Sequence, residues 1–284
     1  MISETGNICT PEGVSLTYNT IGEGPSVILL HGGGQTRHSW SRTAHTLAGL
    51  GYRAISVDAR GHGDSDWTDH YSLEAFAIDL KAVIASLQPG PAPAVIGASL
   101  GGLTAIVALG SDDPPPASAL VLVDIAAKIK QEGAHQIRDF MAANTDGFAS
   151  VEEAADAVSK YMTDRPRPKD VSGLRKNLRE IDGRFYWHWD PSFMTGSAKQ
   201  EVPQTRISID EPAARLRLPV MLVRGEHSTV IDEESIAHFR DLVPHVETEE
   251  VVGAGHMVAG DANSPFTFAI IDFLTRHYPA SIKD

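Results

Sequence analysis

The chain has 284 residues, of which 42% are hydrophobic and 21% are charged, and its formal net charge is -13. This composition excludes disordered and fibrous proteins, and the length suits one large α/β domain or a domain with a sizeable insertion. The negative charge repels phosphate backbones and anionic lipid headgroups, so we expect no nucleic-acid partner and no membrane-surface role.

The start of the chain, MISETGNICTPEG, has neither the basic segment nor the apolar segment of a secretory signal. The single cysteine, Cys9, allows no intrachain disulfide and is interpreted as structural. We therefore expect a cytoplasmic protein. The uncharged stretch Ala82–Ser111 is interrupted by prolines and glycines, so it is interpreted as a buried strand, turn and helix and not as a membrane span.

Taken in chain order, short apolar runs alternate with amphipathic stretches after an expected antiparallel hairpin over Gly13–Thr20. This alternation is typical of a largely parallel sheet covered by helices on both faces, which is an α/β fold. The predicted strands are Ser26–Leu30, Arg53–Val57, Ala94–Ala98, Ala119–Val123, Pro219–Val223 and Glu247–Val252. The predicted helices are Ser39–Leu50, Ser72–Leu87, Leu100–Leu109, Asp232–Leu242 and Pro265–His277.

The alternation fails between Asp124 and about Leu218, a distance far longer than a normal crossover connection. Apolar spacings of three and four predict helices over Gln131–Asn144, Val151–Met162 and Val171–Ile181. We therefore expect a helical cap over residues 125–212, inserted between a first core part, 1–124, and a second, 213–284. Trp187 and Trp189 near its end are candidates for lining an apolar substrate pocket, or for the core of the cap.

The strongest chemical signal is Gly97-Ala98-Ser99-Leu100-Gly101, which lies between a predicted strand and a predicted helix. Small residues on either side of Ser99 permit a sharp turn that exposes its hydroxyl at a helix N-terminus. Ser99 is therefore the candidate nucleophile.

A second glycine-rich segment, His31-Gly32-Gly33-Gly34, follows another predicted strand. Such a loop can turn a backbone N–H toward a developing oxyanion, and we assign an oxyanion hole to the N–H groups of Gly33 and Leu100. A plain tight turn is the alternative. No nucleotide-binding glycine pattern accompanies the segment, which disfavours a phosphate loop.

A third segment, Gly253-Ala254-Gly255-His256-Met257, follows the last predicted strand. Its glycines permit a loop that carries the His256 imidazole over the edge of the sheet, where it would serve as general base. No zinc-binding spacing such as H-E-x-x-H is present, so we predict no metal and no other cofactor.

The chain resembles the α/β-hydrolase superfamily in its segments HGGG, DARGHGDSD, GASLGG, LVLVD and GAGHM. The resemblance implies a mostly parallel eight-stranded sheet with helices on both faces and a helical cap. It also implies a hydrolase whose nucleophile, acid and histidine follow one another in that order. Haloalkane dehalogenases and epoxide hydrolases of this fold carry a carboxylate at the position of Ser99, and dienelactone hydrolases carry a thiol. The serine therefore favours the esterase or lactonase branch.

The acid of the expected triad departs from the usual family pattern. The superfamily commonly places it where this chain has Ser228, and a serine cannot stabilise an imidazolium as a carboxylate does. Some members carry the acid at the end of the preceding strand, where this chain has Asp124, and we favour that residue. Glu226 and Asp232 remain alternatives. Asp58 and Asp64 are expected to brace turns and to pair with Arg60.

These features predict a serine hydrolase that cleaves a small carboxylic ester or lactone through an acyl-enzyme. One alternative is a C–C bond hydrolase of ring-cleavage diketones, although those relatives usually carry tryptophan where this chain has Met257. A second is a ligand-binding protein without hydrolytic activity on the same fold. Perhydrolase activity is a lesser possibility. The sequence does not indicate the oligomeric state.

Overall fold

The computed structural model describes residues 3–87, 90–161, 167, 169–195, 209–254 and 264–280. Within these ranges one eight-stranded sheet has the order β1-β2-β4-β3-β5-β6-β9-β10. The first strand pairs are antiparallel, and every pair from β4 to β10 is parallel. The strands are β1 (Glu4–Cys9), β2 (Ser15–Ile21), β3 (Ser26–Leu30), β4 (Arg53–Val57), β5 (Ala94–Ala98), β6 (Ala119–Val123), β9 (Val220–Gly225) and β10 (Glu247–Val251). The predicted fold class is confirmed.

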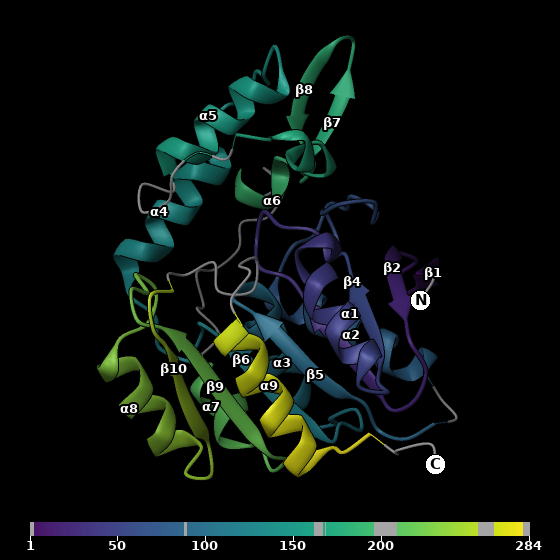
Figure 1. Ribbon diagram of the computed structural model, residues 1–284, viewed down its shortest axis with the longest axis vertical. Helices are drawn as coiled ribbons and strands as arrows, with labels where there is room; N and C mark the ends of the chain where they lie inside the picture. The colour runs from purple at the N-terminus through teal and green to yellow at the C-terminus, as the bar shows by residue number, and fades with distance from the viewer. Residues whose placement is uncertain are drawn as a thin grey trace.

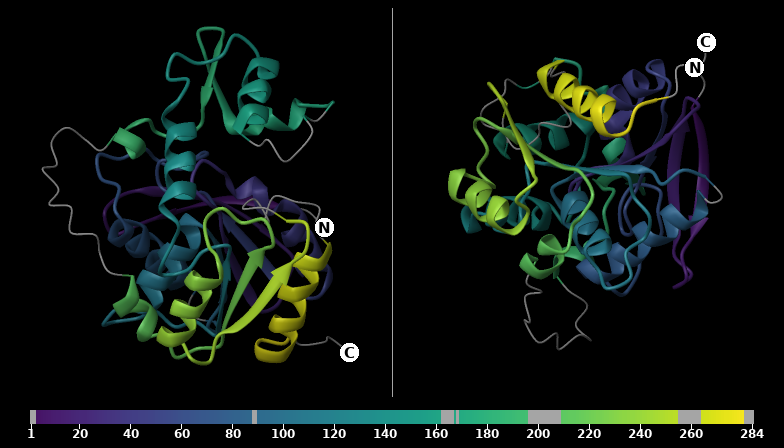
Figure 2. Two further views of the ribbon diagram at one scale, coloured as in Figure 1. Left: turned by 90° about the vertical axis from the view of Figure 1, so that its left-hand side faces the viewer. Right: turned by 90° about the horizontal axis from the view of Figure 1, so that it is seen from below.

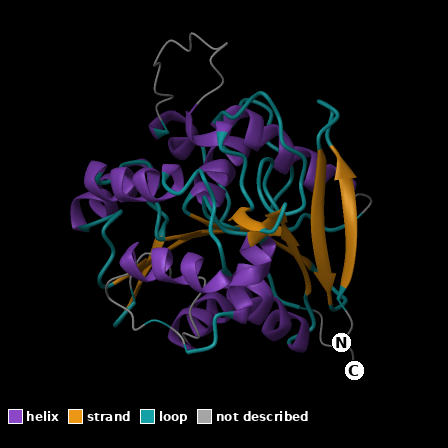
Figure 3. Ribbon diagram, turned by 90° about the horizontal axis from the view of Figure 1, so that it is seen from above, coloured by secondary structure: helices purple, strands orange, loops and turns teal. Residues whose placement is uncertain are grey.

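Helices cover both faces of this sheet (Figure 3). The central strands are apolar on both sides, so each face has its own core. One core includes residues of α1 and α9, and the other includes residues of α2, α3, α7 and α8. These helices are α1 (Ser41–Gly49), α2 (Leu73–Ser86), α3 (Leu100–Leu109), α7 (Asp210–Ala214), α8 (Glu233–Leu242) and α9 (Ser264–His277), and the short 3₁₀ helix η1 (Arg37–Trp40) precedes α1.

The connection between β6 and β9 leaves the sheet and forms a separate layer, which we call the insert and define as residues 125–195. Figure 1 shows α5 and the β7–β8 hairpin standing clear of the sheet, with α4 and α6 between these elements and the sheet. Figure 2 gives the same separation from the side. Its elements are α4 (Gln131–Ala142), α5 (Val151–Tyr161), η2 (Ser172–Asn177), β7 (Leu178–Ile181), β8 (Arg184–Trp187) and α6 (Ser192–Thr195). The predicted boundaries, 125–212, stay a prediction because residues 196–208 lie outside the described ranges.

One predicted helix is wrong. Residues Val171–Ile181 form the 3₁₀ helix η2 followed by strand β7, which pairs with β8 in a hairpin. The turn of this hairpin is Asp182-Gly183, and both residues have positive φ, 49° and 76°. Asp-Gly is a favoured sequence for a two-residue hairpin turn. The apolar residues have the spacings of three and four that are typical of a helix. The Asp182-Gly183 turn favours a hairpin instead, and the hairpin is what forms.

Candidate active site

Ser99 lies on a strained turn between β5 and α3, with φ 45° and ψ -113°. Glycines make this turn possible because the backbone approaches itself closely. A Cβ added to Gly97 would lie 2.5 Å from the carbonyl oxygen of Gly101, and a Cβ on Gly101 would lie 2.6 Å from the carbonyl oxygen of Leu30. A non-glycine residue held in this region of backbone space is typical of functional sites. The turn therefore has the geometry of a nucleophile elbow.

The residue after Ser99 begins a helix. Leu100 is the first residue of α3, so its N–H is one of the helix N-terminal donors that have no acceptor within the helix. The partial positive charge of this helix end favours negative charge beside Ser99. The role of this N–H as an oxyanion donor stays a prediction.

The glycine loop passes directly beside Ser99. A Cβ added to Gly32 would lie 3.3 Å from the Cβ of Ser99. The carbonyl oxygen of Gly32 accepts hydrogen bonds from His31 Nδ1 at 2.8 Å and from the N–H of Gln35 at 3.1 Å. Because this carbonyl and the N–H of Gly33 belong to one peptide plane and point in opposite directions, the two bonds fix the direction of the Gly33 N–H. Gly33 and Ser99 line the same cavity.

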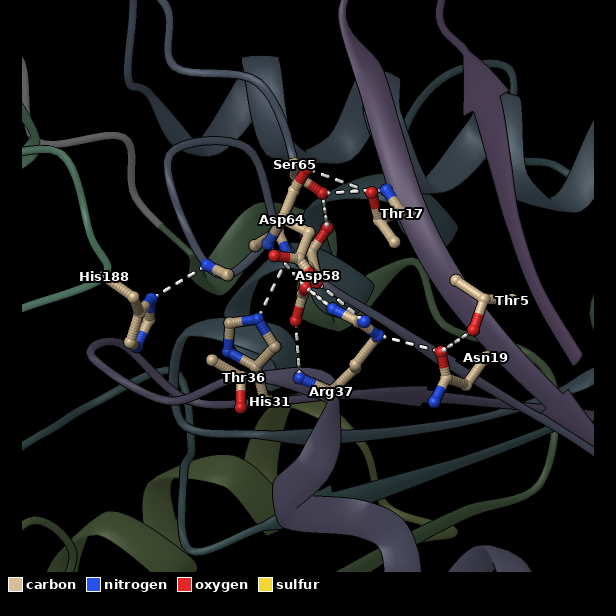
Figure 4. Close-up of polar contacts among 12 residues, drawn as sticks. Thr5, Thr17, Asn19, His31, Thr36, Arg37, Asp58, Asp64, Ser65 and His188 are labelled. Atoms are coloured by element: carbon tan, nitrogen blue, oxygen red, sulfur yellow. Dashed lines mark hydrogen bonds and ion pairs between the residues drawn. The ribbon is translucent and has the colours of Figure 1, made fainter. Parts of the chain in front are cut away.

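Three buried histidines, His31, His62 and His188, hold this loop in place, and we call them the histidine column. The ring centroids of His31 and His62 lie 5.3 Å apart, and those of His62 and His188 lie 5.8 Å apart. Figure 4 shows His31 and His188 among the polar contacts of this region. The sequence analysis assigned no role to these side chains. His31 and His62 come from two loops of the core, whereas His188 comes from the insert, and all of their hydrogen-bond partners are backbone groups of the two loops.

Each ring accepts from one backbone N–H and donates to one backbone carbonyl. His31 Nε2 accepts from the N–H of Ala59 at 3.0 Å. His62 Nε2 accepts from the N–H of Gly34 at 3.2 Å, and its Nδ1 lies 3.0 Å from the carbonyl oxygen of Arg60. These partners require a neutral ring, since a protonated ring has no acceptor left.

His188 joins the insert to the core by the same kind of contact. Its Nδ1 accepts from the N–H of Gly63 at 2.8 Å, and its Nε2 lies 3.2 Å from the carbonyl oxygen of Gly34. The two backbone groups of Gly34 are thus bound by His62 and His188. His188 thereby joins the insert by a hydrogen bond to the glycine loop that lies beside Ser99.

Burial keeps the three rings neutral. It lowers the pKa of His31, and it lowers the pKa of His62 to about 3, with the nearby His31 adding to the effect. Burial also holds the pKa of His188 well below its usual range, with His62 and His31 acting in the same direction. The column is therefore uncharged at neutral pH.

Asp124 follows β6 and is fully buried, with φ 51°. Its Oδ1 accepts from the N–H of Gly225 at 3.2 Å, and its Oδ2 accepts from the hydroxyl of Ser228 at 2.7 Å. Ser228 Oγ in turn accepts from the N–H groups of Val230 at 3.1 Å and Ile231 at 3.2 Å. The residue at the usual acid position thus hydrogen-bonds the carboxylate on the neighbouring strand.

The two alternative acids have other partners. Glu226 is 41% exposed, and its Oε2 accepts from the N–H of Gly253 at 2.8 Å. Asp232 is the N-cap of α8 and accepts from the N–H of Ser235 at 3.0 Å, which lowers its pKa. His256, the predicted base, lies outside the described residues, so its role and that of Asp124 stay predictions.

A cavity of 150 Å³ lies between Ser99 and the insert. Trp187 and Trp189 both line it, and their rings stack with centroids 4.9 Å apart at 12°. They also belong to the apolar core of the insert, so both interpretations made from the sequence describe them. The cavity is lined by Gly32, Gly33, Gly34, Gln35, Ser39, Ala98, Ser99, Ile137, Phe140, Met141, Val158, Tyr161, Leu174, Asn177, Trp187 and Trp189.

The predicted pairing of Asp58 and Asp64 with Arg60 is wrong. Both carboxylates contact Arg37, which the sequence analysis did not consider (Figure 4). Arg60 binds Asp79 at 2.7 Å instead and also contacts Glu12. The bracing role itself holds, because Asp58 Oδ2 also accepts from the N–H of Asp64 at 2.9 Å. The error arose because the true partner lies 21 residues away in sequence.

Comparison with known proteins matches residues 25–262 to the family model described as alpha/beta hydrolase fold. The chain belongs to the α/β-hydrolase fold family. It is 31% identical to esterase Rv0045c of Mycobacterium tuberculosis over 254 residues, covering 84% of this chain and 79% of that protein. It is 30% identical to the sn-1-specific diacylglycerol lipase ABHD11 of Mus musculus over 272 residues, covering 91% of this chain and 85% of that protein.

Among solved structures, E-2-(acetamidomethylene)succinate hydrolase superposes with a TM-score of 0.84 at 21% identity, covering 96% of this chain and 99% of that one. That likeness shows the fold alone. With its esterase and lipase relatives, this α/β-hydrolase is an enzyme of the hydrolase class, as predicted.

The described ranges contain no group of histidine, cysteine and acidic side chains arranged to hold a metal ion. No helix in the same ranges has the length and apolarity needed to cross a membrane. The cytoplasmic location stays a prediction.

Proposed function

We propose that this α/β-hydrolase is a serine hydrolase that cleaves a small carboxylic ester or a lactone through an acyl-enzyme, with Ser99 as its nucleophile. The observation that carries the proposal is the strained Ser99 turn, which lies beside the glycine loop and lines a cavity of 150 Å³ together with it. The esterase and lipase relatives at 30–31% identity support the ester bond as the target.

In the proposed first half-reaction, His256 removes the hydroxyl proton as Ser99 Oγ attacks the ester carbonyl. The N–H groups of Gly33 and Leu100 donate hydrogen bonds to the carbonyl oxygen and stabilise the negative charge that develops on it. The alcohol then leaves with the proton that His256 held. For a lactone, the alcohol stays attached to the acyl group.

In the second half-reaction, His256 activates a water that attacks the acyl-enzyme and releases the acid. Asp124 would hold His256 in the tautomer that faces Ser99 and would stabilise the imidazolium. Its burial and its hydrogen bonds from Gly225 and Ser228 hold the carboxylate in one orientation. The insert would act as a cap that encloses the acyl group.

Substitution of Ser99 by alanine tests the nucleophile. We expect S99A to lose hydrolysis of p-nitrophenyl butyrate, because no other group at this turn can form the acyl-enzyme. Its thermal unfolding should match the wild type, since the hydroxyl is the only group removed. A fluorophosphonate probe should label the wild type at Ser99 and leave S99A unlabelled.

Two results would contradict the proposal: turnover retained in S99A, or labelling at another residue. A lactone panel and a vinylogous diketone, assayed alongside the esters, identify the bond. Faster turnover of the diketone would favour the C–C hydrolase, and tight binding of ligands without turnover would favour the binding protein.

A further inference from the structure

The indole N–H of Trp187 is buried without a hydrogen-bond acceptor in the described structure. The side chain is 8% exposed, and it lines the cavity that contains Ser99. A buried donor without an acceptor is unfavourable, and such groups in native proteins call for an explanation. The unpaired N–H of Trp40, by contrast, lies in the core of the sheet and does not line this cavity.

The neighbouring tryptophan provides a direct comparison. Trp189 stacks on Trp187 and lines the same cavity, but its Nε1 donates to the carbonyl oxygen of Met141 at 3.2 Å. The two rings thus offer similar apolar surface. They differ in that the N–H of Trp189 donates a hydrogen bond within the protein and that of Trp187 does not. Of the two indoles, only that of Trp187 keeps its N–H available for an acceptor on a ligand in this cavity.

The chemistry of the lining narrows the kind of acceptor. None of the described residues around the cavity carries a charged side chain, so a carboxylate or phosphate on the ligand would be desolvated without a counter-charge. A neutral oxygen is compatible with this environment. The volume of 150 Å³ is that of an engineered protein cavity that holds one benzene molecule, so the group that enters is small.

We infer that the substrate carries a neutral oxygen acceptor, an ether, carbonyl or hydroxyl oxygen, on its acyl group, and that the Trp187 N–H binds it. The inference rests on the proposed function, in which the acyl group remains attached to Ser99 while the alcohol leaves. The acyl group is therefore the part that an enclosed cavity beside Ser99 retains. Trp187 is in this view a specificity-determining residue.

The test uses pairs of p-nitrophenyl esters that differ only by oxygen in place of a methylene: methoxyacetate with butanoate, 3-methoxypropanoate with pentanoate, and 4-methoxybutanoate with hexanoate. The ratio of kcat/KM within each pair measures recognition of the oxygen. We expect W187F to lower this ratio about tenfold for the pair whose oxygen reaches the indole, which is the upper range for one hydrogen bond between neutral groups. W189F is the matched control and should leave every ratio unchanged.

The inference is overturned when W187F leaves all three ratios at their wild-type values, or when W187F and W189F lower them equally. Those results would leave the proposed function intact as long as the esters turn over at Ser99. Failure of the wild type to hydrolyse any of the esters, together with absence of fluorophosphonate labelling, would instead contradict the proposed function.

A second measurement covers the case in which W187F does not fold. Wild-type protein with ¹⁵N-labelled tryptophan is phosphonylated at Ser99 with alkyl and methoxyalkyl phosphonates of equal length. The chain has four tryptophans, so the Trp187 indole resonance is identified by comparison with W40F, W67F and W189F. A downfield shift of the Trp187 N–H with the methoxyalkyl adduct alone supports the inference. The same shift with both adducts, or no shift with either, overturns it.

Discussion

The contact between Asp124 and Ser228 explains how a chain with serine at the usual acid position can still supply a carboxylate. The hydroxyl of Ser228 donates a hydrogen bond of 2.7 Å to Asp124 Oδ2. The carboxylate is therefore held between the ends of two neighbouring parallel strands, β6 and β9. Because parallel strands present their carboxyl ends together, this position lies at the same sheet edge as Ser99.

At this scale we expect D124N to lower kcat by roughly three to four orders of magnitude, because the amide favours the wrong tautomer of His256. S228A removes only one neutral donor to the carboxylate and should lower kcat by less than about tenfold. Steady-state kinetics on one activated ester measures both. E226Q and D232N are the controls, and a loss in either that equals the loss in D124N would contradict the assignment.

At the scale of elements, His188 links β8 of the insert to the two loops below it. Its ring is the partner of both the Gly63 N–H and the Gly34 carbonyl, so its removal leaves one buried and one partly buried backbone group without this partner. The same contact supports the loop that carries the Gly33 N–H. His188 therefore couples the position of the insert to the loop that carries the Gly33 N–H, which is the proposed oxyanion donor.

We expect H188A to lower the free energy of unfolding by about 2–4 kcal/mol, which is the cost of leaving these two groups unsatisfied. It should also lower kcat about tenfold or more, because the glycine loop loses one of its supports. Urea unfolding and steady-state kinetics measure the two effects. H45A, at an exposed histidine of α1, is the matched control and should change neither. Wild-type kinetics in a stable H188A would show that the loop does not depend on the column.

At the scale of the whole molecule, the histidine column predicts a dependence of stability on pH. The pKa of His62 is about 3 in the folded protein, below the ordinary value of 6.5, and burial lowers the pKa of His31 and His188 as well. Below about pH 6.5 these histidines therefore bind protons in the unfolded chain and stay neutral in the folded chain. Above that pH these histidines do not change the free energy of unfolding. Below it they lower the free energy of unfolding by up to about 1.4 kcal/mol per pH unit for each histidine.

Urea unfolding between pH 7.5 and 5.5, where most carboxylates stay ionised, measures this slope. His62→Gln keeps one acceptor and one donor and removes the titration, so the slope in that variant should fall by one proton. An unchanged slope in the variant would show that His62 does not resist protonation in the folded state.

Most of the fold could be predicted because its signals are local. The buried strands are continuous apolar runs, and the turn at Ser99 needs small residues at fixed offsets, which the sequence displays directly. The β7–β8 hairpin was missed because Val171, Leu174, Leu178 and Ile181 have helical spacing, although Asp182-Gly183 carried the opposite signal.

The missed parts of the site depend on partners distant in sequence. His188 contacts backbone groups 125 and 154 residues away, and no local pattern indicates such a pairing. The free N–H of Trp187 is equally invisible in the sequence, because Trp189, two residues further on, is the same residue type. Only the structure shows which of the two indoles is already paired.

The hydrogen bond between Asp124 and Ser228 also has an evolutionary consequence. The Asp124 carboxylate follows β6, and its hydrogen-bond partner, the Ser228 hydroxyl, follows the neighbouring strand β9. The carboxylate could therefore be moved from one strand to the other by single substitutions. Ser228→Asp alone would place two carboxyl groups together, and such a pair shares one proton and keeps one charge. A later Asp124→Ser would complete the exchange. Each intermediate sequence retains a carboxylate at the sheet edge. With Asp124 in its proposed role, the triad acid could therefore move between the two strands without the loss of that carboxylate.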